Sequence, residues 1–400
     1  MTRPDLTPAV LARPADAVQA EATAERLRAE LPRLGLRAEV RLVEVERADA
    51  FGTALAEAFA DAAGEYLLTL PGGVAPDLDL IGRLWAGRGT ADVLVAEPCG
   101  ARRRGSRLEQ WLGGLFGAVL GLPTRELFGG PRLYRSAVVR GLAPRLAGRW
   151  AAPEVLVRLH ADGWRIGTVP AGWRSALGIR ERLKLRAVPA ALGALGSLWR
   201  LRTSILSADY DDRAYDSPIP LQRYWQRTRF KHITELSRDQ GRTLDVGCGS
   251  SRIIGALSAD AVCLDVLLRK LRYARKFGRP LVQGSGFHLP FRDATFDCVI
   301  CSQVIEHVPR ESPILAELDR VLKPGGRLVL GTPDYARWEW VYIEKLYARV
   351  APGGYAEEHI THYTQRELVE LFERRGYTVE AVRYILRGEL ILALRKPATV

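Results

Sequence analysis

The segment Thr243–Arg252, T-L-D-V-G-C-G-S-S-R, constrains the fold of this chain more than any other stretch of its sequence. A hydrophobic run that contains Asp245 leads into Gly247 and Gly249, which is typical of a strand followed by a tight turn and a helix. Glycine lacks a Cβ atom and tolerates positive φ, so a ligand can approach such a turn closely. Asp265 ends the next strand-like run, where an acid can accept hydrogen bonds from both ribose hydroxyls.

This G-x-G pair is compatible with several nucleoside cofactors, NAD and FAD among them, but two details favour a cationic one. The third glycine of the dinucleotide pattern is absent, and Asp245 lies two residues before Gly247. A carboxylate at that position would repel a pyrophosphate, whereas it would attract an amine or a sulfonium.

Chain length and periodicity predict two α/β domains. Four hundred residues exceed the usual size of one hydrophobic core. Both halves alternate strand-like and helix-like segments, which predicts parallel sheets. The polar, turn-rich stretch Ser207–Pro220 indicates the join. The expected division is a first domain at 1–208, a linker with an N-terminal cap at 209–240, and a second domain at 241–400. The expected strands are 38–45, 65–70, 91–96 and 164–169 in the first half, and 242–246, 261–265, 280–283, 296–301 and 327–331 in the second.

Charge and cysteine usage narrow the classes of partner. The formal net charge is +12, but the basic residues are scattered, without a Lys/Arg block or an aromatic stripe, so no nucleic-acid partner is expected. Cys298 and Cys301 lie in a strand-like run, where residues three apart face opposite sides, so neither a metal site nor a redox pair is expected there.

No signal peptide and no transmembrane run are expected, which favours a cytoplasmic protein. The segment Leu185–Leu206 is apolar, with arginines at its ends. This segment could lie on a membrane surface, for example at the inner face of the membrane. Alternatively, it could form a helix that is docked on its own domain.

Five ordered motifs in the second half resemble those of the class I S-adenosylmethionine-dependent methyltransferases, in particular the type 11 group that includes ubiquinone- and menaquinone-biosynthesis enzymes. The resemblance covers about 241–395. Its motifs are L-D-V-G-C-G at 244–249, L-P-F at 289–291, F-D-C-V-I at 296–300, S-Q-V-I-E-H-V at 302–308 and L-K-P-G-G at 322–326.

The resemblance implies a Rossmann-like domain with a seven-stranded sheet, and S-adenosyl-L-methionine as the cofactor. Ser302 is expected beside the methionine amine. Ser285 stands where the family usually has an acid that receives the adenine amino group, which implies a weaker bond there. The implied cofactor-binding residues are Asp245, Gly247, Cys248, Gly249, Asp265, Val266, Ser285, Gly286, Phe287 and Ser302.

A general base is needed only where the acceptor must lose a proton, as a hydroxyl would. His307 and His359 are the candidates, although both could instead brace the structure, and no metal site is expected. The aromatic segment 334–355 follows the fifth strand, where this family carries substrate caps. Its rings suit an apolar acceptor or packing within the cap itself.

The first half, over roughly 6–206, resembles a family 2 glycosyltransferase of the dolichol-phosphate-mannose synthase type. Glu154 falls at a matching position, and Glu126 stands where an Asp is usual. Where that family has a metal-binding D-x-D, this chain has Pro71, Gly72 and Gly73, which supply no ligand oxygen from their side chains. We therefore expect a second Rossmann-like domain, a degenerate glycosyltransferase that acts as a scaffold, a docking module or an oligomerisation surface.

Together these features predict methyl transfer to a small-molecule, glycolipid or polyprenyl-linked acceptor. Two alternatives remain open at this stage. One is a bifunctional glycosyl- and methyltransferase, and the other is a scaffold that binds the cofactor without catalysis. The sequence does not determine the oligomeric state.

Overall fold

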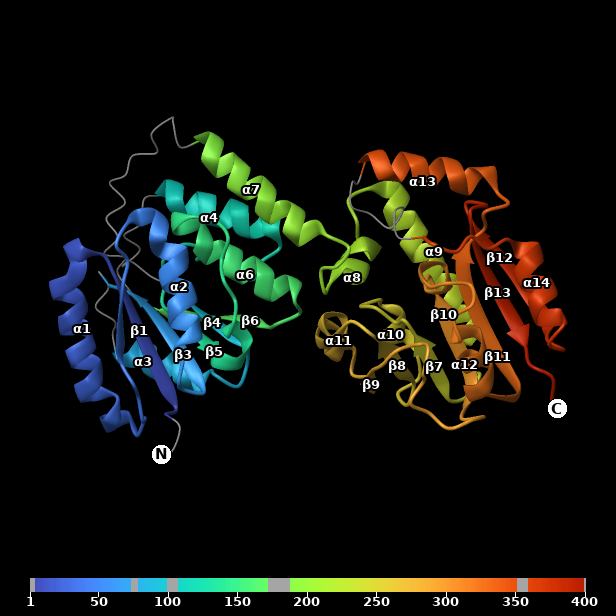
Figure 1. Cartoon of the computed structure of the whole chain (residues 1–400), viewed down its shortest axis with the longest axis horizontal. Coiled ribbons are helices and arrows are strands. Elements are labelled where there is room, and N and C mark those ends of the chain that lie inside the picture. Colours follow the sequence, from blue (N-terminus) through green and yellow to red (C-terminus); the bar gives the residue numbers. More distant parts are fainter. Residues whose placement is uncertain (1–3, 73–77, 99–106, 172–187, 351–358, 399–400) are drawn as a thin grey trace. The chain divides into compact units, whose positions relative to one another are not determined.

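The structure is a computed structural model that describes residues 4–72, 78–98, 107–171, 188–350 and 359–398. The chain forms two compact units, Met1–Thr203 and Ser204–Val400 (Figure 1). The sequence placed the end of the first domain at residue 208. The structure assigns residues 204–208 to the second unit, because Ile205 packs there with Tyr210 and Ala214.

The N-terminal unit contains a six-stranded mixed sheet in the order β2-β1-β3-β5-β4-β6. Strand β5 runs antiparallel to β3 and β4, whereas the other pairs are parallel. The predicted strands correspond to β2, β3, β4 and β6, but β1 and β5 were not predicted. The strands are β1 Leu6–Ala12, β2 Arg41–Glu44, β3 Tyr66–Pro71, β4 Val93–Pro98, β5 Arg132–Arg135 and β6 Ile166–Ala171.

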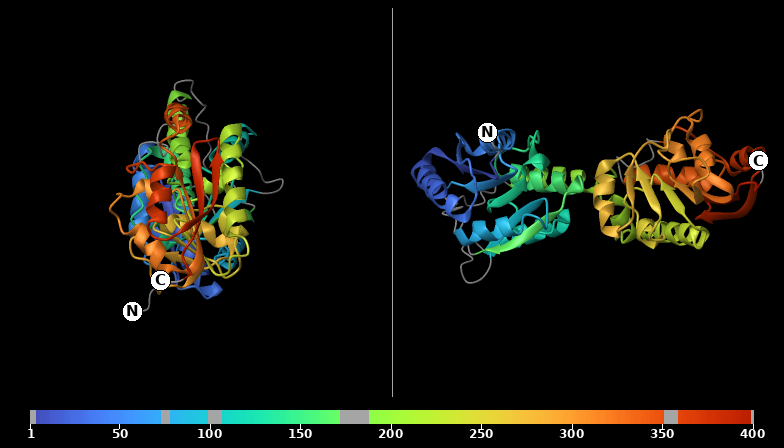
Figure 2. Two further views of the ribbon diagram at one scale, coloured as in Figure 1. Left: turned by 90° about the vertical axis from the view of Figure 1, so that its right-hand side faces the viewer. Right: turned by 90° about the horizontal axis from the view of Figure 1, so that it is seen from below.

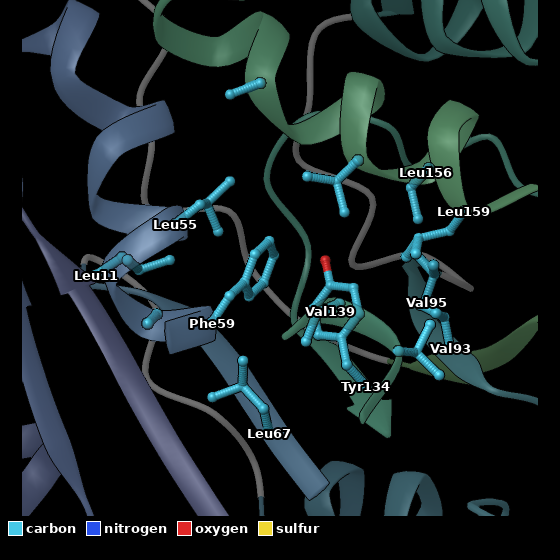
Figure 3. Packing of buried hydrophobic residues seen from close by; sticks show 14 of the residues in the cluster. Leu11, Leu55, Phe59, Leu67, Val93, Val95, Tyr134, Val139, Leu156 and Leu159 are labelled. Atoms are coloured by element: carbon cyan, nitrogen blue, oxygen red, sulfur yellow. The ribbon is translucent and has the colours of Figure 1, made fainter. Parts of the chain in front are cut away.

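Alternating side chains of these strands enter two hydrophobic cores, one on each face of the sheet. On one face Phe59 of α2 meets Tyr134 of β5 edge to face, with ring centroids 5.5 Å apart (Figure 3). The helices of this unit are α1 Ala17–Glu30, α2 Phe51–Ala60, α3 Leu78–Ala86, α4 Arg107–Leu120, α5 Ser136–Val139, α6 Ala151–Ala161 and α7 Val188–Thr203.

The C-terminal unit contains a seven-stranded sheet in the order β12-β13-β11-β10-β7-β8-β9. Strand β13 runs antiparallel to both of its neighbours, and all other pairs are parallel. The five strands predicted for this half correspond to β7 through β11. The strands are β7 Thr243–Val246, β8 Val262–Asp265, β9 Leu281–Gln283, β10 Phe296–Ser302, β11 Leu322–Pro333, β12 Thr378–Ile385 and β13 Glu389–Arg395.

Helices cover both faces of this sheet (Figure 2). Along β10, Cys298 packs in the core on one face and Cys301 in the core on the other, so the two thiols cannot form a pair. The helices are α8 Tyr210–Tyr215, α9 Pro220–Ser237, α10 Ile253–Ala256, α11 Leu268–Ala274, α12 Ile314–Val321, α13 Trp338–Val350 and α14 Gln365–Glu373.

The strand order creates the crevice in which a site can form. The chain passes from β7 outward through β8 and β9, and then returns to the other side of β7 as β10. The loops that follow β7 and β10 therefore diverge, and ligands of open α/β sheets bind where this happens. Among the described helices, none combines the length and the hydrophobicity that crossing a lipid bilayer requires.

Candidate active site

A cavity of about 610 Å³ opens at the carboxyl ends of β7, β8 and β10. The sequence pointed to ten cofactor-binding residues and two candidate bases, and the structure brings all twelve to this one cavity. They are Asp245, Gly247, Cys248, Gly249, Asp265, Val266, Ser285, Gly286, Phe287, Ser302, His307 and His359.

The turn after β7 requires glycine at two positions. Gly247 has a φ of 75° and Gly249 a φ of 56°, a region that other residues adopt at a cost. A Cβ atom on Gly247 would also collide with Cγ2 of Val304, and one on Gly249 would lie 2.6 Å from Oδ2 of Asp211. The turn thus packs as bare backbone against two other segments, and its path depends on glycine.

Asp265 is held at the cavity by two backbone amides. The N–H of Gly249 donates to its Oδ2 at 2.8 Å, and the N–H of Leu267 donates to its Oδ1 at 2.7 Å. Each carboxylate oxygen has a second lone pair for a hydroxyl donor. Burial raises the pKa of Asp265, while the two amides oppose the rise. The geometry suits a carboxylate that accepts from a pair of ribose hydroxyls.

Asp245 is 5% exposed, at the end of β7. Burial, together with the nearby Asp265, raises the pKa of Asp245 to about 7. A cationic ligand group would stabilise the ionised carboxylate and so offset the cost of its burial. The expectation that this end of the cavity receives an amine stays a prediction.

Ser302 lines the cavity, but its hydroxyl group is buried. Its Oγ is buried and has no hydrogen-bond partner among the described residues. The hydroxyl is closed off from the open cavity and lies towards Gly331 of β11, where an added Cβ atom would be 2.5 Å from it, so its contact with the cofactor stays a prediction. The glycine turn, the amide-held Asp265 and the buried Asp245 fit a nucleoside that carries a cationic amino-acid group.

At the end of the cavity where the adenine is expected, Ser285 replaces the acid that the family usually has. Ser285 Oγ accepts a hydrogen bond from the N–H of Phe287 at 3.2 Å, so the hydroxyl already caps its own turn. Val266 is 63% exposed and Phe287 is half-buried, and both are available to flank a ring.

Sequence reasoning missed the part of the cavity wall that comes from residues 205–229. Asp211 of α8 lies over the glycine turn, where its Oδ2 accepts from the N–H of Ser250 at 2.9 Å and from Nζ of Lys270 at 2.9 Å. Burial raises the pKa of Asp211, but Lys270 and Ser250 outweigh it and hold that pKa below its usual range. The polar, aperiodic sequence around Asp211 carried no signal of this position.

Apolar side chains from three segments line the cavity beside the cofactor residues. The indole rings of Trp225 on α9 and Trp340 on α13 lie 5.8 Å apart. Nε1 of Trp225 donates a hydrogen bond to the buried carboxylate of Glu389, which also forms an ion pair with Arg229 at 2.6 Å. The other apolar members are Ile205, Leu206, Ile219, Leu221, Val304, Val308 and Ile343.

The expected aromatic cap contributes one ring to the cavity. Trp340 lines it, whereas Trp338 and Tyr342 are 73% and 63% exposed, and the side chain of Tyr347 lies outside the described part.

His307 and His359 face each other, with ring centroids 4.8 Å apart. His359 Nδ1 lies 2.9 Å from Oε1 of Glu344 and 2.8 Å from the hydroxyl of Tyr335. Burial lowers the pKa of His359 although Glu344 opposes this effect, so the ring is neutral near pH 7. Both histidines line the cavity, and their role as bases stays a prediction.

Known proteins resemble this unit. A family model described as a methyltransferase domain matches residues 244–330. A demethylmenaquinone methyltransferase of Streptomyces avermitilis is 32% identical over 190 residues, which are 42% of this chain and 81% of that protein. A malonyl-[acyl-carrier protein] O-methyltransferase of Methylococcus capsulatus is 30% identical over 196 residues, 46% of this chain and 69% of that protein.

A solved S-adenosylmethionine-dependent methyltransferase of Mesorhizobium loti is 16% identical, with a TM-score of 0.35, over 44% of this chain and 100% of its own. The sequence relatives and the site define the class of protein. Through its C-terminal unit the chain belongs to the class I S-adenosylmethionine-dependent methyltransferases, enzymes that use S-adenosyl-L-methionine as cofactor.

Proposed function

We propose that this enzyme methylates a hydroxyl group of a largely apolar acceptor, such as a glycolipid or a polyprenyl-linked molecule, on the cytoplasmic side of the cell. The observation that carries the proposal is the single cavity, in which the cofactor residues continue into a wall that includes Trp225, Trp340 and Ile343. A hydrophobic wall favours a ring or a lipid chain.

In this proposal the ten residues predicted from the sequence hold the cofactor. Asp245 and Ser302 meet the methionine amine, Asp265 binds the ribose, and Val266 and Phe287 flank the adenine. Methyl transfer is an in-line displacement, so the main task of the protein is to align the acceptor with the methyl group. When bound, the cofactor supplies an electrophilic methyl group on a sulfonium.

A hydroxyl acceptor must also lose its proton, and His307 and His359 are the groups placed to assist. Glu344 and Tyr335 orient the His359 ring, and the lowered pKa keeps it unprotonated. An orienting carboxylate is the usual support for a histidine that handles a proton.

For the N-terminal unit we propose a glycosyltransferase-like scaffold or docking module without a metal site. Glu126 accepts from the backbone N–H groups of Phe128, Gly129 and Gly130, at 2.9 to 3.2 Å, and so caps its own turn. Glu154 is 4% exposed and accepts from the N–H groups of residues 145 and 146.

The strand end where a D-x-D would stand supports the same view. The N–H of Gly72 donates to the carbonyl of Leu11 at 2.6 Å, and a Cβ on Gly72 would lie 2.6 Å from Cβ of Ala12. Backbone fills this place, and Pro71 and Gly72 offer no carboxylate. Apolar α7 exposes Leu192 and Trp199, which suits docking to a lipid-linked acceptor or to a membrane surface.

The cofactor site is tested by calorimetric titration of S-adenosylhomocysteine into the full chain and into Asp265→Ala. We expect a Kd of roughly 1–100 µM, about −8 to −5.5 kcal/mol. The variant should lose about 1.5–3 kcal/mol of this, because hydrogen bonds to a charged group disappear. Asp260→Ala, at an exposed position, is the matched control.

The acceptor class is tested with methyl-labelled cofactor and a total lipid extract. Label in the organic phase that depends on the wild-type enzyme supports the proposal, and label confined to water-soluble products contradicts it. Manganese-dependent binding of a nucleotide sugar would instead favour a bifunctional enzyme.

A further inference from the structure

Three groups that can bind metal ions lie close together beside the cavity: His307 and His359 line it, and Glu306 is fully buried next to them. Glu306 and His307 belong to the short helix Ile305–His307 that follows β10, and His359 lies about fifty residues further along the chain. One ligand atom from each of the three lies within 4.8 Å of the others. The sequence offered the two histidines as separate candidate bases and did not include Glu306.

The backbone holds this cluster together. The carbonyl oxygen of Glu306 accepts hydrogen bonds from the N–H groups of Ile360 and Thr361, at 2.9 and 3.0 Å. These bonds fasten the segment that carries His359 to the helix that carries the other two groups. The arrangement is therefore part of the fold and does not depend on side chains alone.

Glu306 is the group that most requires a partner. It is completely buried, and its Oε2 accepts from the hydroxyl of Thr332 at 3.2 Å. Its Oε1 is also buried and has no hydrogen-bond partner among the described residues. A buried, unpaired carboxyl oxygen is costly unless a cation or a donor satisfies it.

His359 has the support that metal-binding histidines usually have. Its Nδ1 lies against Glu344 and Tyr335, so Nε2 is the ring nitrogen that remains for a ligand. Metal-bound histidines commonly direct their second nitrogen to a carboxylate, which fixes the tautomer and the orientation of the ring. Glu306 within the cluster and Glu344 beside it would together balance the two positive charges of a divalent cation.

We propose that Glu306, His307 and His359 bind one divalent transition-metal ion in the acceptor part of the cavity. Two imidazoles and one carboxylate are a common set for zinc, and three protein ligands leave a position open for a substrate oxygen.

The role of the ion rests on the proposed function, with one change: His307 and His359 hold the ion, and the ion replaces them as the group that promotes loss of the acceptor's proton. An acceptor hydroxyl that binds the ion loses its proton to solvent more readily, because the ion stabilises the resulting oxyanion. The oxygen lone pair then forms the new bond to the methyl carbon. The bond between this carbon and sulfur breaks with its electron pair going to sulfur, which leaves neutral S-adenosylhomocysteine.

The test is a titration of the full-length, chelator-treated protein with Co²⁺, followed by visible absorption, with Zn²⁺ as the competitor. We expect one equivalent of Co²⁺ to give the weak bands of a nitrogen- and oxygen-ligated ion, which Zn²⁺ then removes. His307→Ala and His359→Ala should each lower the affinity by at least about tenfold, and Glu306→Gln should also weaken binding. His288→Ala, at an exposed histidine outside the cluster, should bind as the wild type does.

Binding of S-adenosylhomocysteine is measured on every variant to show that it is folded. Variants that keep this binding but lose Co²⁺ support the metal site. Stoichiometric binding that survives His359→Ala, or intense thiolate bands from the buried cysteines, would overturn it, as would the absence of bound Co²⁺ in protein that binds S-adenosylhomocysteine. Failure to bind S-adenosylhomocysteine alone would contradict the proposed cofactor site and leave the Co²⁺ result as an independent measurement.

Discussion

The two units use their carboxylates in opposite ways. In the N-terminal unit Glu126 and Glu154 are occupied by backbone amides, so their charges serve local turns. In the C-terminal unit Asp245 and Glu306 are buried with raised pKa values, and Glu306 keeps an oxygen unpaired. Perturbed acids in a cavity indicate function, whereas satisfied acids indicate structure. The comparison supports the proposal that the second half carries the chemistry and the first half acts as a scaffold or docking module.

The largest effect that would sharpen this comparison is expected for Gly247→Ala. The variant combines positive φ with a collision at Val304, which should lower the free energy of unfolding by about 3 kcal/mol or more. It should also abolish S-adenosylhomocysteine binding in calorimetry.

Gly278→Ala is its matched control, because Gly278 has a φ of 68° but open space around its Cα. It should cost about 1–2 kcal/mol in urea unfolding and leave ligand binding intact. If the two variants lost equal amounts of unfolding free energy and of S-adenosylhomocysteine affinity, the close packing at Gly247 would have no part in the site.

The second effect concerns pH and Asp245. Its pKa of about 7 means that the carboxyl group is mostly neutral below that pH and must lose its proton to pair with the ligand amine. The affinity for S-adenosylhomocysteine should therefore rise with pH below about 7, by at most about tenfold per unit, and level off above it.

Asp245→Asn should bind more weakly than the wild type above pH 7 and lose this dependence. Calorimetry from pH 5.5 to 8.5 measures both. A wild-type affinity that is constant over this range would contradict the pairing of Asp245 with a cationic group.

A smaller effect is expected for Ser302→Ala. The loss of a hydroxyl that bonds to the ligand should weaken S-adenosylhomocysteine binding by about 0.5–1.5 kcal/mol. Ser312 also has a buried hydroxyl without a partner among the described residues, but it does not line the cavity. Ser312→Ala should therefore leave the Kd unchanged. Weaker binding in both variants would show that Ser302 acts through the fold.

The smallest effect on the site is expected for Glu154→Gln. The N-terminal unit should lose about 1–3 kcal/mol of stability in urea, because two backbone amides lose a charged acceptor. The Kd for S-adenosylhomocysteine should stay the same. A change in that Kd would show that the N-terminal unit influences the methyltransferase site directly.

Local patterns predicted much of the fold and the cofactor half of the site. The strand-like runs of the second half correspond to β7 through β11, because buried strands are marked by short apolar segments. The sequence T-Q-R-E at Thr364–Glu367 is typical of a capping box, and the structure forms one. The N–H of Glu367 donates to Oγ of Thr364 at 3.2 Å, and the N–H of Thr364 donates to the Glu367 carboxylate at 2.9 Å. Strands β1, β5, β12 and β13 were missed.

By itself, the sequence determined the nucleoside site, since a glycine turn and the acids at two strand ends are encoded within about twenty residues. Only the tertiary structure decided what surrounds it. Asp211 reached the glycine turn from a stretch that had the pattern of a linker, and Glu306 met His359 through backbone bonds across some fifty residues. Such meetings follow from how strands and loops pack in space, which local periodicity does not encode.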